Sequence, residues 1–271
     1  MRLVTLLKSG VVLDLYYFKN NRASFFGMLV YPYLMLGLIL GAGFLFGSAE
    51  AFRRNVGLNV DPVLYFIAST VVAMASVSVM WEVGGNVMFL RWLGALPYVL
   101  LAPHRMSVVL VVSYIPRYVL FQLIQILEFL PLIMVLHGPI EALYRTAVII
   151  VATMIGMLPL LGFSAIFAAV MLHLEEESNV LNWLNPLILL FSGAFYPVYL
   201  LPAWARAVST MLPTTYTLEL ARIASLVSMP SMGAYVALFS ILLGLTVLYN
   251  SLSLVLVGKS EEAVLRRGGI S

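Results

Sequence analysis

Long apolar runs are the feature that most constrains what this chain can fold into. About 20 consecutive apolar residues cross the hydrocarbon core of a bilayer, and 62% of the 271 residues are hydrophobic while 10% are charged, against roughly 25% charged in soluble domains. The spans we expect are residues 25–47, 63–90, 107–136, 146–172, 234–257 and a short one at 181–195. Because backbone groups in lipid must bond within their own segment, the sequence predicts an all-α membrane protein with six transmembrane helices.

The distribution of Lys and Arg predicts the orientation. Six crossings put both termini on one side, and cations gather in cytoplasmic loops. With both termini in the cytoplasm, the inner segments hold Arg2, Lys8, Lys19, Arg22, Arg91, Arg105, Lys259, Arg266 and Arg267, and the outer ones hold Arg53, Arg54, Arg145, Arg206 and Arg222. This bias favours a multi-pass protein of the cell membrane with cytoplasmic termini. The cations form no basic run or face, so we expect membrane lipid and no nucleic acid as a partner.

A proline-broken apolar stretch near the C-terminal end points to transport. It is hydrophobic enough for a bilayer, yet Gly193, Pro197, Pro202 and Pro213 prevent one straight helix from crossing it. The peptide groups freed at each break need partners, so this backbone must lie against protein or beside water. Broken spans of this kind usually line a path.

The first 22 residues predict an amphipathic helix. Apolar residues recur at helical spacing between polar ones, so a helix over 1–22 would lie along the inner membrane interface. It is either a simple anchor or an element that a cytoplasmic partner moves.

Three segments together resemble the membrane permeases of type-2 ABC exporters. They are Arg91-Trp-Leu-Gly94-Ala-Leu96-Pro-Tyr-Val-Leu100-Leu101-Ala102-Pro103 between the second and third spans, Ser192-Gly-Ala-Phe-Tyr-Pro-Val-Tyr-Leu-Leu-Pro-Ala-Trp204, and Leu212-Pro-Thr-Thr-Tyr-Thr-Leu-Glu-Leu-Ala-Arg222. Length, six spans and the N-terminal helix are similar to that family as well. The resemblance covers essentially the whole chain.

The resemblance implies two functional regions. Residues 91–105 correspond to the cytoplasmic coupling helix that docks on a nucleotide-binding subunit, and residues 196–222 to a re-entrant helical hairpin in the outer leaflet. Many members carry Thr and Glu where this chain has Ala95 and Pro97, so we expect an interrupted coupling helix. The implied partner-coupling residues are Arg91, Gly94, Leu96 and Pro103, and the outer gate consists of Gly193, Tyr196, Pro197, Pro202, Pro213 and Tyr216.

The chain has no motif that could hydrolyse ATP or hold a metal. Its one Gly-Lys-Ser, at 258–260, lacks the leading Gly of a phosphate-binding loop and is expected to be a helix end. ATP and Mg would therefore be bound by a separate ATPase subunit, and this chain would bind no cofactor and would not be an enzyme. His104, His137 and His173 lie near three different span ends, and the chain has no cysteine, so we expect no metal site.

Four polar residues are predicted inside the membrane: Glu82, Arg117, Gln125 and Glu128. Arg117, Gln125 and Glu128 share a helix stripe with Tyr114 and Phe121, and about 16 Å of helix rise separates Arg117 from Glu128. Those two charges cannot pair, whereas Glu82 could pair with Arg117. The stripe could be polar contact inside the bundle, part of a substrate path or a proton relay.

The function these observations favour is that of a permease subunit of an ABC exporter, working by alternating access as a homodimer or heterodimer. The alternative is an ion-coupled secondary transporter, which would need carboxylates such as Glu128 at mid-membrane and usually an internal repeat. A membrane-embedded enzyme would need converging nucleophile, base or metal ligands, which we do not find. Small residues that would permit close helix approach are Gly37, Gly41, Gly43, Gly156 and Gly162. The substrate could be a drug, a lipid, a glycan or a polysaccharide.

Overall fold

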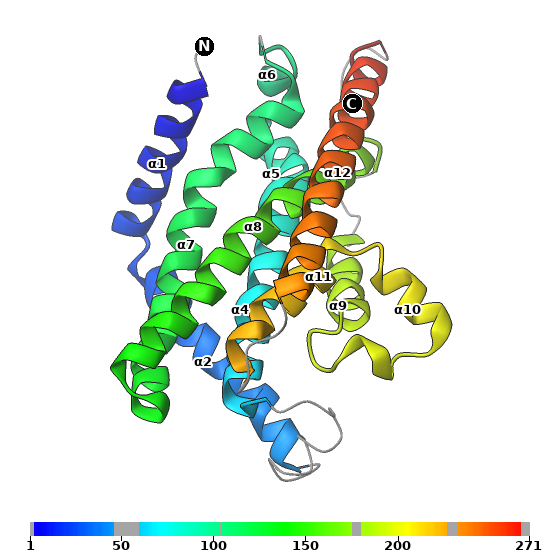
Figure 1. The fold of residues 1–271 in the computed structure, drawn as a ribbon. Coiled ribbons are helices and arrows are strands. Elements are labelled where there is room, and N and C mark those ends of the chain that lie inside the picture. The colour runs from blue at the N-terminus through cyan, green and yellow to red at the C-terminus, as the bar shows by residue number, and fades with distance from the viewer. Residues whose placement is uncertain (1–2, 46–59, 103, 175–179, 227–231, 267–271) are drawn as a thin grey trace.

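The chain folds into a bundle of helices (Figure 1). The computed structural model describes residues 3–45, 60–102, 104–174, 180–226 and 232–266. Within these ranges there is no β-strand, and one isolated antiparallel bridge joins Val60 to Leu226. By length and composition, four of the described helices could cross a membrane: Pro62–Gly84, Met106–His137, Pro139–Met171 and Gly233–Arg266.

Helix α4 (Pro62–Val79) is at the centre of the bundle, where 78% of its most apolar stretch is buried. Its start is fixed by Asp61, whose Oδ1 accepts a hydrogen bond from the Leu64 N–H at 2.9 Å, and by Pro62 in the first turn. A π-helical turn, η1 (Met80–Gly84), continues it. The first half of α4 packs in one apolar cluster with α11, and its last turns in a second cluster with α5 and α6.

Helices α7 (Met106–His137) and α8 (Pro139–Met171) form a long antiparallel hairpin, and α12 (Met232–Arg266) runs along α8 (Figure 1). The hairpin reverses at Gly138, whose φ of 82° is a conformation that favours glycine. Helices α8 and α12 approach closely because Gly162 has no side chain. A Cβ there would lie 2.5 Å from the backbone N of Asn250.

The first two helices are α1 (Leu3–Asn20) and α2 (Arg22–Leu45). Helix α1 packs along α7, where a Cβ on Gly10 would lie 2.5 Å from the carbonyl oxygen of Ser113. Helix α2 contacts α4 and α7. The predicted N-terminal helix therefore contacts the bundle directly, so any partner that displaced α1 would also act on α7.

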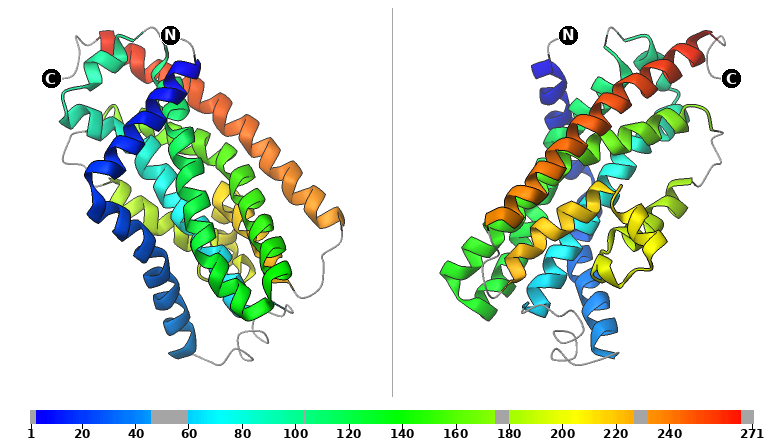
Figure 2. Two further views of the ribbon diagram at one scale, coloured as in Figure 1. Left: turned by 90° about the vertical axis from the view of Figure 1, so that its left-hand side faces the viewer. Right: turned by 45° about the vertical axis from the view of Figure 1, so that its right-hand side comes forward.

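The proline-broken stretch is indeed broken at each predicted position. It consists of α9 (Val180–Ser192), the 3-10 turn η2 (Val198–Leu200), α10 (Ala203–Ser209), α11 (Pro213–Arg222) and the 3-10 turn η3 (Ile223–Ser225). Helix α11 packs against α4, α8 and α12, whereas α10 contacts α9 and η2. The segment is thus divided between an inner helix in the core and an outer group beside it (Figure 2).

Several helix bounds differ from those expected. Helix α8 starts at Pro139 rather than near 146, since Pro is favourable in a first helical turn. Helix α12 continues past residue 257 to Arg266, because polar residues can extend a helix beyond its apolar stretch. The Gly-Lys-Ser at 258–260, which was expected to be a helix end, therefore lies inside the helix. Of the six expected crossings, α2 and α9 are not among the four long apolar helices. Helix α9, with 13 residues, is about 20 Å long, less than the roughly 30 Å hydrocarbon core.

The two ends of the bundle carry different elements. The N-terminal end of α1, the short helix α6 (Leu96–Leu100) and the C-terminal end of α12 lie at one end, the top of Figure 1. The turn between α7 and α8 lies at the opposite end. Helix α6, which belongs to the region expected to face a partner, therefore lies at the same end of the bundle as the start of α1 and the end of α12, the first and last described helices of the chain.

Candidate functional site

A short helical hairpin occupies the region predicted to couple to a partner. Helix α5 (Asn86–Trp92) ends at a turn where Gly94 has a φ of 66°, and α6 begins with Pro97 in its first turn. Proline fits there because a first-turn N–H has no partner within the helix. The interruption expected from Pro97 is therefore present. We refer to residues 86–102 as the α5–α6 hairpin.

Arg91 attaches this hairpin to the end of α8. Its Nη2 donates to the carbonyl oxygens of Leu172 at 3.1 Å and Met171 at 3.4 Å, and its Nη1 donates to that of Leu174. The last carbonyls of a helix have no partner within the helix and carry partial negative charge, so a guanidinium satisfies both needs. A displacement of the hairpin would consequently be transmitted to α8.

The outer side of the hairpin is apolar and exposed. Leu96 and Leu100 point inward, with 0% and 6% of their surface exposed, and pack in the core. Four large side chains point outward, which we call the hairpin patch: Trp92 (78% exposed), Leu93 (59%), Tyr98 (78%) and Leu101 (77%). Clustered exposed apolar side chains are typical of surfaces that bind lipid or another protein.

The four predicted coupling residues have different places in this region. Arg91 holds α8, Gly94 forms the turn, and Leu96 is a core residue that shapes the hairpin without reaching its surface. Pro103 lies outside the described residues. The sequence interpretation did not single out the hairpin patch. The spacing of Leu96 and Leu100, one helical turn apart, marks the inner face and could have identified Tyr98 as outward-facing.

The predicted outer-gate residues lie at helix ends and in turns. Gly193 ends α9 with a φ of 78°, while Pro197 and Pro202 precede η2 and α10. Pro213 is the first residue of α11. Both tyrosine hydroxyls donate a hydrogen bond to a backbone carbonyl. The Tyr196 hydroxyl donates to Leu190 at 2.6 Å, and the Tyr216 hydroxyl donates to Thr210 at 3.0 Å. These tyrosines therefore stabilise the broken segment itself.

Arg222, which the sequence interpretation did not select as a site residue, connects this segment to the core. Its Nη2 donates to the carbonyl oxygens of Gly193 at 2.7 Å and Ala194 at 3.0 Å, and its Nε donates to Ser69 Oγ at 2.8 Å. The guanidinium also lies 4.2 Å from the centre of the Tyr65 ring. One buried side chain at the end of α11 thus joins the end of α9 to α4.

A polar stripe runs along the seam between α4 and α7. Arg117 Nη1 lies 2.7 Å from Glu82 Oε2, so the pairing considered from the sequence is present. The guanidinium also lies 5.5 Å from the centre of the Phe121 ring. The Arg117 and Glu82 side chains are 27% and 35% exposed. In a membrane, a charge pair this exposed needs water or another protein surface beside it.

The π turn positions Glu82 for this pair. Ser164 of α8 bridges the turn, because its Oγ accepts from the Gly84 N–H at 2.9 Å and donates to the Val79 carbonyl at 2.9 Å. Turns of this type are frequent at functional sites. Met80, Val83 and Gly84 of this turn are buried, whereas the Glu82 side chain is 35% exposed.

Further along α7, the stripe includes a carboxylate, that of Glu128, with no hydrogen-bond donor among the described residues. Gln122 Nε2 donates to Gln125 Oε1 at 3.2 Å, and the Tyr33 hydroxyl donates to the backbone carbonyl of Glu128. Neither carboxylate oxygen of Glu128 has a hydrogen-bond partner among the described residues. The structure therefore brings Glu82 and Arg117 together and leaves Gln125 and Glu128 apart from that pair.

Removing the pair one partner at a time should reveal its coupling. In Glu82→Gln or Arg117→Gln the remaining charge loses this ion pair, whereas the double variant has neither charge. We expect the double variant to be more stable than the sum of the single effects by about 0.5–3 kcal/mol. Thermal melting of the purified variants measures this difference. Additive effects would show that the two charges act independently.

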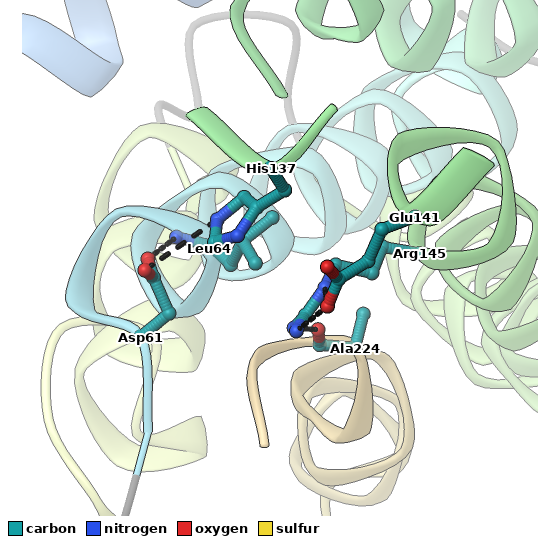
Figure 3. Close-up of polar contacts among 6 residues, drawn as sticks. All are labelled: Asp61, Leu64, His137, Glu141, Arg145 and Ala224. Atoms are coloured by element: carbon teal, nitrogen blue, oxygen red, sulfur yellow. Dashed lines mark hydrogen bonds and ion pairs between the residues drawn. The ribbon is translucent and has the colours of Figure 1, made fainter. Parts of the chain in front are cut away.

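A second polar cluster lies at the end of the bundle where α7 turns into α8 (Figure 3). Arg145 Nε donates to Glu141 Oε1 at 3.0 Å, and its Nη1 donates to the Ala224 carbonyl. His137 Nε2 lies 3.5 Å from Asp61 Oδ2. The cluster joins the α7–α8 turn to the start of α4 and the end of η3.

The class of this protein follows from its fold alone. No group of three or more His, Asp or Glu side chains that could hold a metal ion occurs in the described ranges. No protein-family model, curated protein or solved structure matches the chain. What the fold defines is an all-α protein with long apolar helices suited to a membrane.

Proposed function

We propose that this chain is the membrane permease subunit of an ATP-binding cassette exporter. It would lie in the cell membrane with both termini in the cytoplasm and move its substrate outward by alternating access. A separate nucleotide-binding subunit would bind ATP and Mg and hydrolyse the nucleotide. This chain would bind no cofactor and would not itself be an enzyme.

The observation that carries the proposal is the α5–α6 hairpin. It presents Trp92, Tyr98 and Leu101 outward while Arg91 attaches it to the last carbonyls of α8. A partner that bound the hairpin patch and moved it would displace α8, one of the longest helices of the bundle. Tryptophan and tyrosine are enriched among the few residues that carry most of the binding energy in protein interfaces.

Two further features support a dimeric exporter. The broken segment α9–α11 places backbone breaks beside the core, as expected for an outer gate built from the re-entrant residues 196–222. The pair Glu82–Arg117 is part-exposed on the bundle surface. A second permease subunit, identical or not, would cover that pair or enclose it in a shared aqueous path. Six crossings, with α2 and α9 included, remain part of this proposal.

The test is whether ATPase activity follows the hairpin patch. A tagged chain is purified from its native membranes, and the ATP hydrolysis that elutes with it is measured. We expect Leu101→Asp and Tyr98→Asp to reduce this activity at least about tenfold, since each places a charge at an apolar contact. A matched control is Ile140→Asp, an 85% exposed aliphatic residue at the opposite end of the bundle, which should leave the activity unchanged.

Export by the reconstituted chain without any ATPase would contradict the proposal. The alternative, an ion-coupled secondary transporter, is favoured by one observation, the Glu128 carboxylate without a partner among the described residues. Such a carboxylate could take up a proton or cation. Substrate movement driven by an ion gradient across vesicles that contain the purified chain alone would establish that alternative.

A further inference from the structure

Glu128 carries a carboxyl group that the proposed export mechanism does not use. It lies on α7, one of the helices long and apolar enough to cross a membrane. Both carboxyl oxygens are inaccessible to solvent, and neither has a hydrogen-bond partner among the described residues. An ionised carboxylate in such a place is unfavourable, because it has lost its water and gained no donor or cation in return. The side chain therefore requires either a counter-charge or a proton.

The first two helices do not supply a counter-charge. Their described cations are Lys8, Lys19 and Arg22, all three of which are exposed. No ion pair joins any of them to Glu128 in the described part of the chain. Helix α4, which also packs against α7, contains no Lys, Arg or His.

The charges of α7, α8 and α12 are paired with other residues or lie elsewhere. Arg117 of α7 pairs with Glu82, and Arg145 of α8 pairs with Glu141. The charged residues of α12 are confined to its last turns, and that end of α12 lies beside the start of α7 at Met106. Within the described ranges, the structure therefore provides no cation for the carboxyl of α7 under discussion.

Tyr33 is the titratable side chain that faces Glu128. Its hydroxyl donates to the backbone carbonyl of Glu128, and its ring lies 5.2 Å from that of Phe129, centre to centre. A phenol has one proton to donate. Because that proton is bound to the backbone, Tyr33 covers this part of α7 without stabilising a charge on the carboxylate.

The closed surroundings of Glu128 favour a proton over a metal ion. A metal such as Ca²⁺ or Mg²⁺ needs several oxygen ligands around it, and the described ranges contain no group of three or more His, Asp or Glu side chains that could hold one. The inaccessible oxygens are also closed to a hydrated ion. A proton needs no cavity, and it converts the carboxylate into a neutral group.

We infer that Glu128 is a proton-binding site that is occupied at neutral pH while α2 lies against α7. The proton comes from the surrounding water and returns to it. Ionisation requires water to reach the carboxylate, so the proton leaves only when the contact through Tyr33 opens. The inference concerns the charge of one side chain, and it holds whether ATP or an ion gradient drives transport.

Infrared spectroscopy of the purified chain in phosphatidylcholine nanodiscs detects this proton directly. A protonated carboxyl group has a C=O stretching band that a carboxylate lacks. At neutral pH, Glu128→Gln should remove intensity from that band, since glutamine keeps the size of the side chain and has no acidic proton. Glu262→Gln is the matched control, because a 73% exposed glutamate is already ionised at neutral pH and should contribute nothing to the band. A band unchanged by Glu128→Gln would overturn the inference.

Thermal melting against pH gives a second, independent measurement. If Glu128 is already neutral, Glu128→Gln should change the melting temperature little at neutral pH. As the pH rises, the parent should lose stability relative to this variant, because its folded state holds a proton that the unfolded state has released. Glu128→Met, also uncharged and of similar length, should behave in the same way. A parent that became more stable than both variants as the pH rose would show an ionised, stabilised carboxylate, and the inference would be wrong.

Discussion

Arg222→Leu should be among the most destabilising substitutions in this protein. It leaves the carbonyls of Gly193 and Ala194 and the hydroxyl of Ser69 without their shared donor, and it removes the cation from the Tyr65 ring. Hydrogen bonds to charged groups contribute about 1.5–3 kcal/mol each, so a loss on the order of 3 kcal/mol or more is expected. Thermal melting of the purified protein measures it.

Two comparisons make the Arg222 result specific. Arg222→Lys keeps the charge but places its donors on one nitrogen, so it should recover only part of the lost stability. Arg206→Leu removes a cation from the exposed face of α10 and should change stability by no more than about 0.5 kcal/mol. Equal melting temperatures for Arg222→Leu and Arg206→Leu would mean that the Arg222 contacts do not hold α9, α11 and α4 together.

Gly162→Leu should separate α8 from α12. A Cβ at this position would meet the backbone of α12, 2.5 Å from Asn250 N and 2.6 Å from the carbonyl carbon of Tyr249, and backbone cannot rotate away. Overpacking costs about 1–3 kcal/mol and more where the neighbour cannot adjust. The displacement should also break the bond from Asn250 Nδ2 to the Leu158 carbonyl, now 2.9 Å. A large drop in melting temperature is expected.

The control for Gly162→Leu is a glycine substitution that is not expected to lower stability. A Cβ added to Gly244 of α12 would meet no described atom within 4 Å, so Gly244→Ala should leave stability unchanged or raise it by up to about 1 kcal/mol through helix propensity. If Gly162→Leu melted like Gly244→Ala, the two helices would not be in the close contact described above.

The helical class and the breaks in the chain could be predicted from the sequence. Long apolar runs require helices. Single prolines do not break them here, since Pro116 and Pro131 lie inside α7, whereas the closely spaced Pro197, Pro202 and Pro213 do mark breaks. The pairing of Glu82 with Arg117 was also within reach, because an unpaired charge is unfavourable in a membrane and the two helices are neighbours in the chain. Of the small residues, Gly156 and Gly162 do permit close contacts, whereas Gly37 and Gly41 have no described atom within 4 Å of a Cβ position.

The roles of the arginines could not be predicted in this way. Arg91 and Arg222 bind carbonyl oxygens at the ends of other helices, and a carbonyl is present at every residue, so no sequence pattern marks the partner. The lack of a hydrogen-bond partner for the Asn185 amide among the described residues could not be predicted for a related reason, since it depends on how α9 packs against α11 and η1. Both features depend on tertiary packing rather than on local propensity.

The way these arginines are bound has a consequence for tolerance to acid. An ion pair weakens once its carboxylate takes up a proton, but the backbone carbonyl oxygens that accept from Arg91 and Arg222 do not titrate. The stability of two junctions should therefore not depend on whether the surrounding solution is acidic or neutral. They are the junction of α8 with the α5–α6 hairpin and that of α9 with α11.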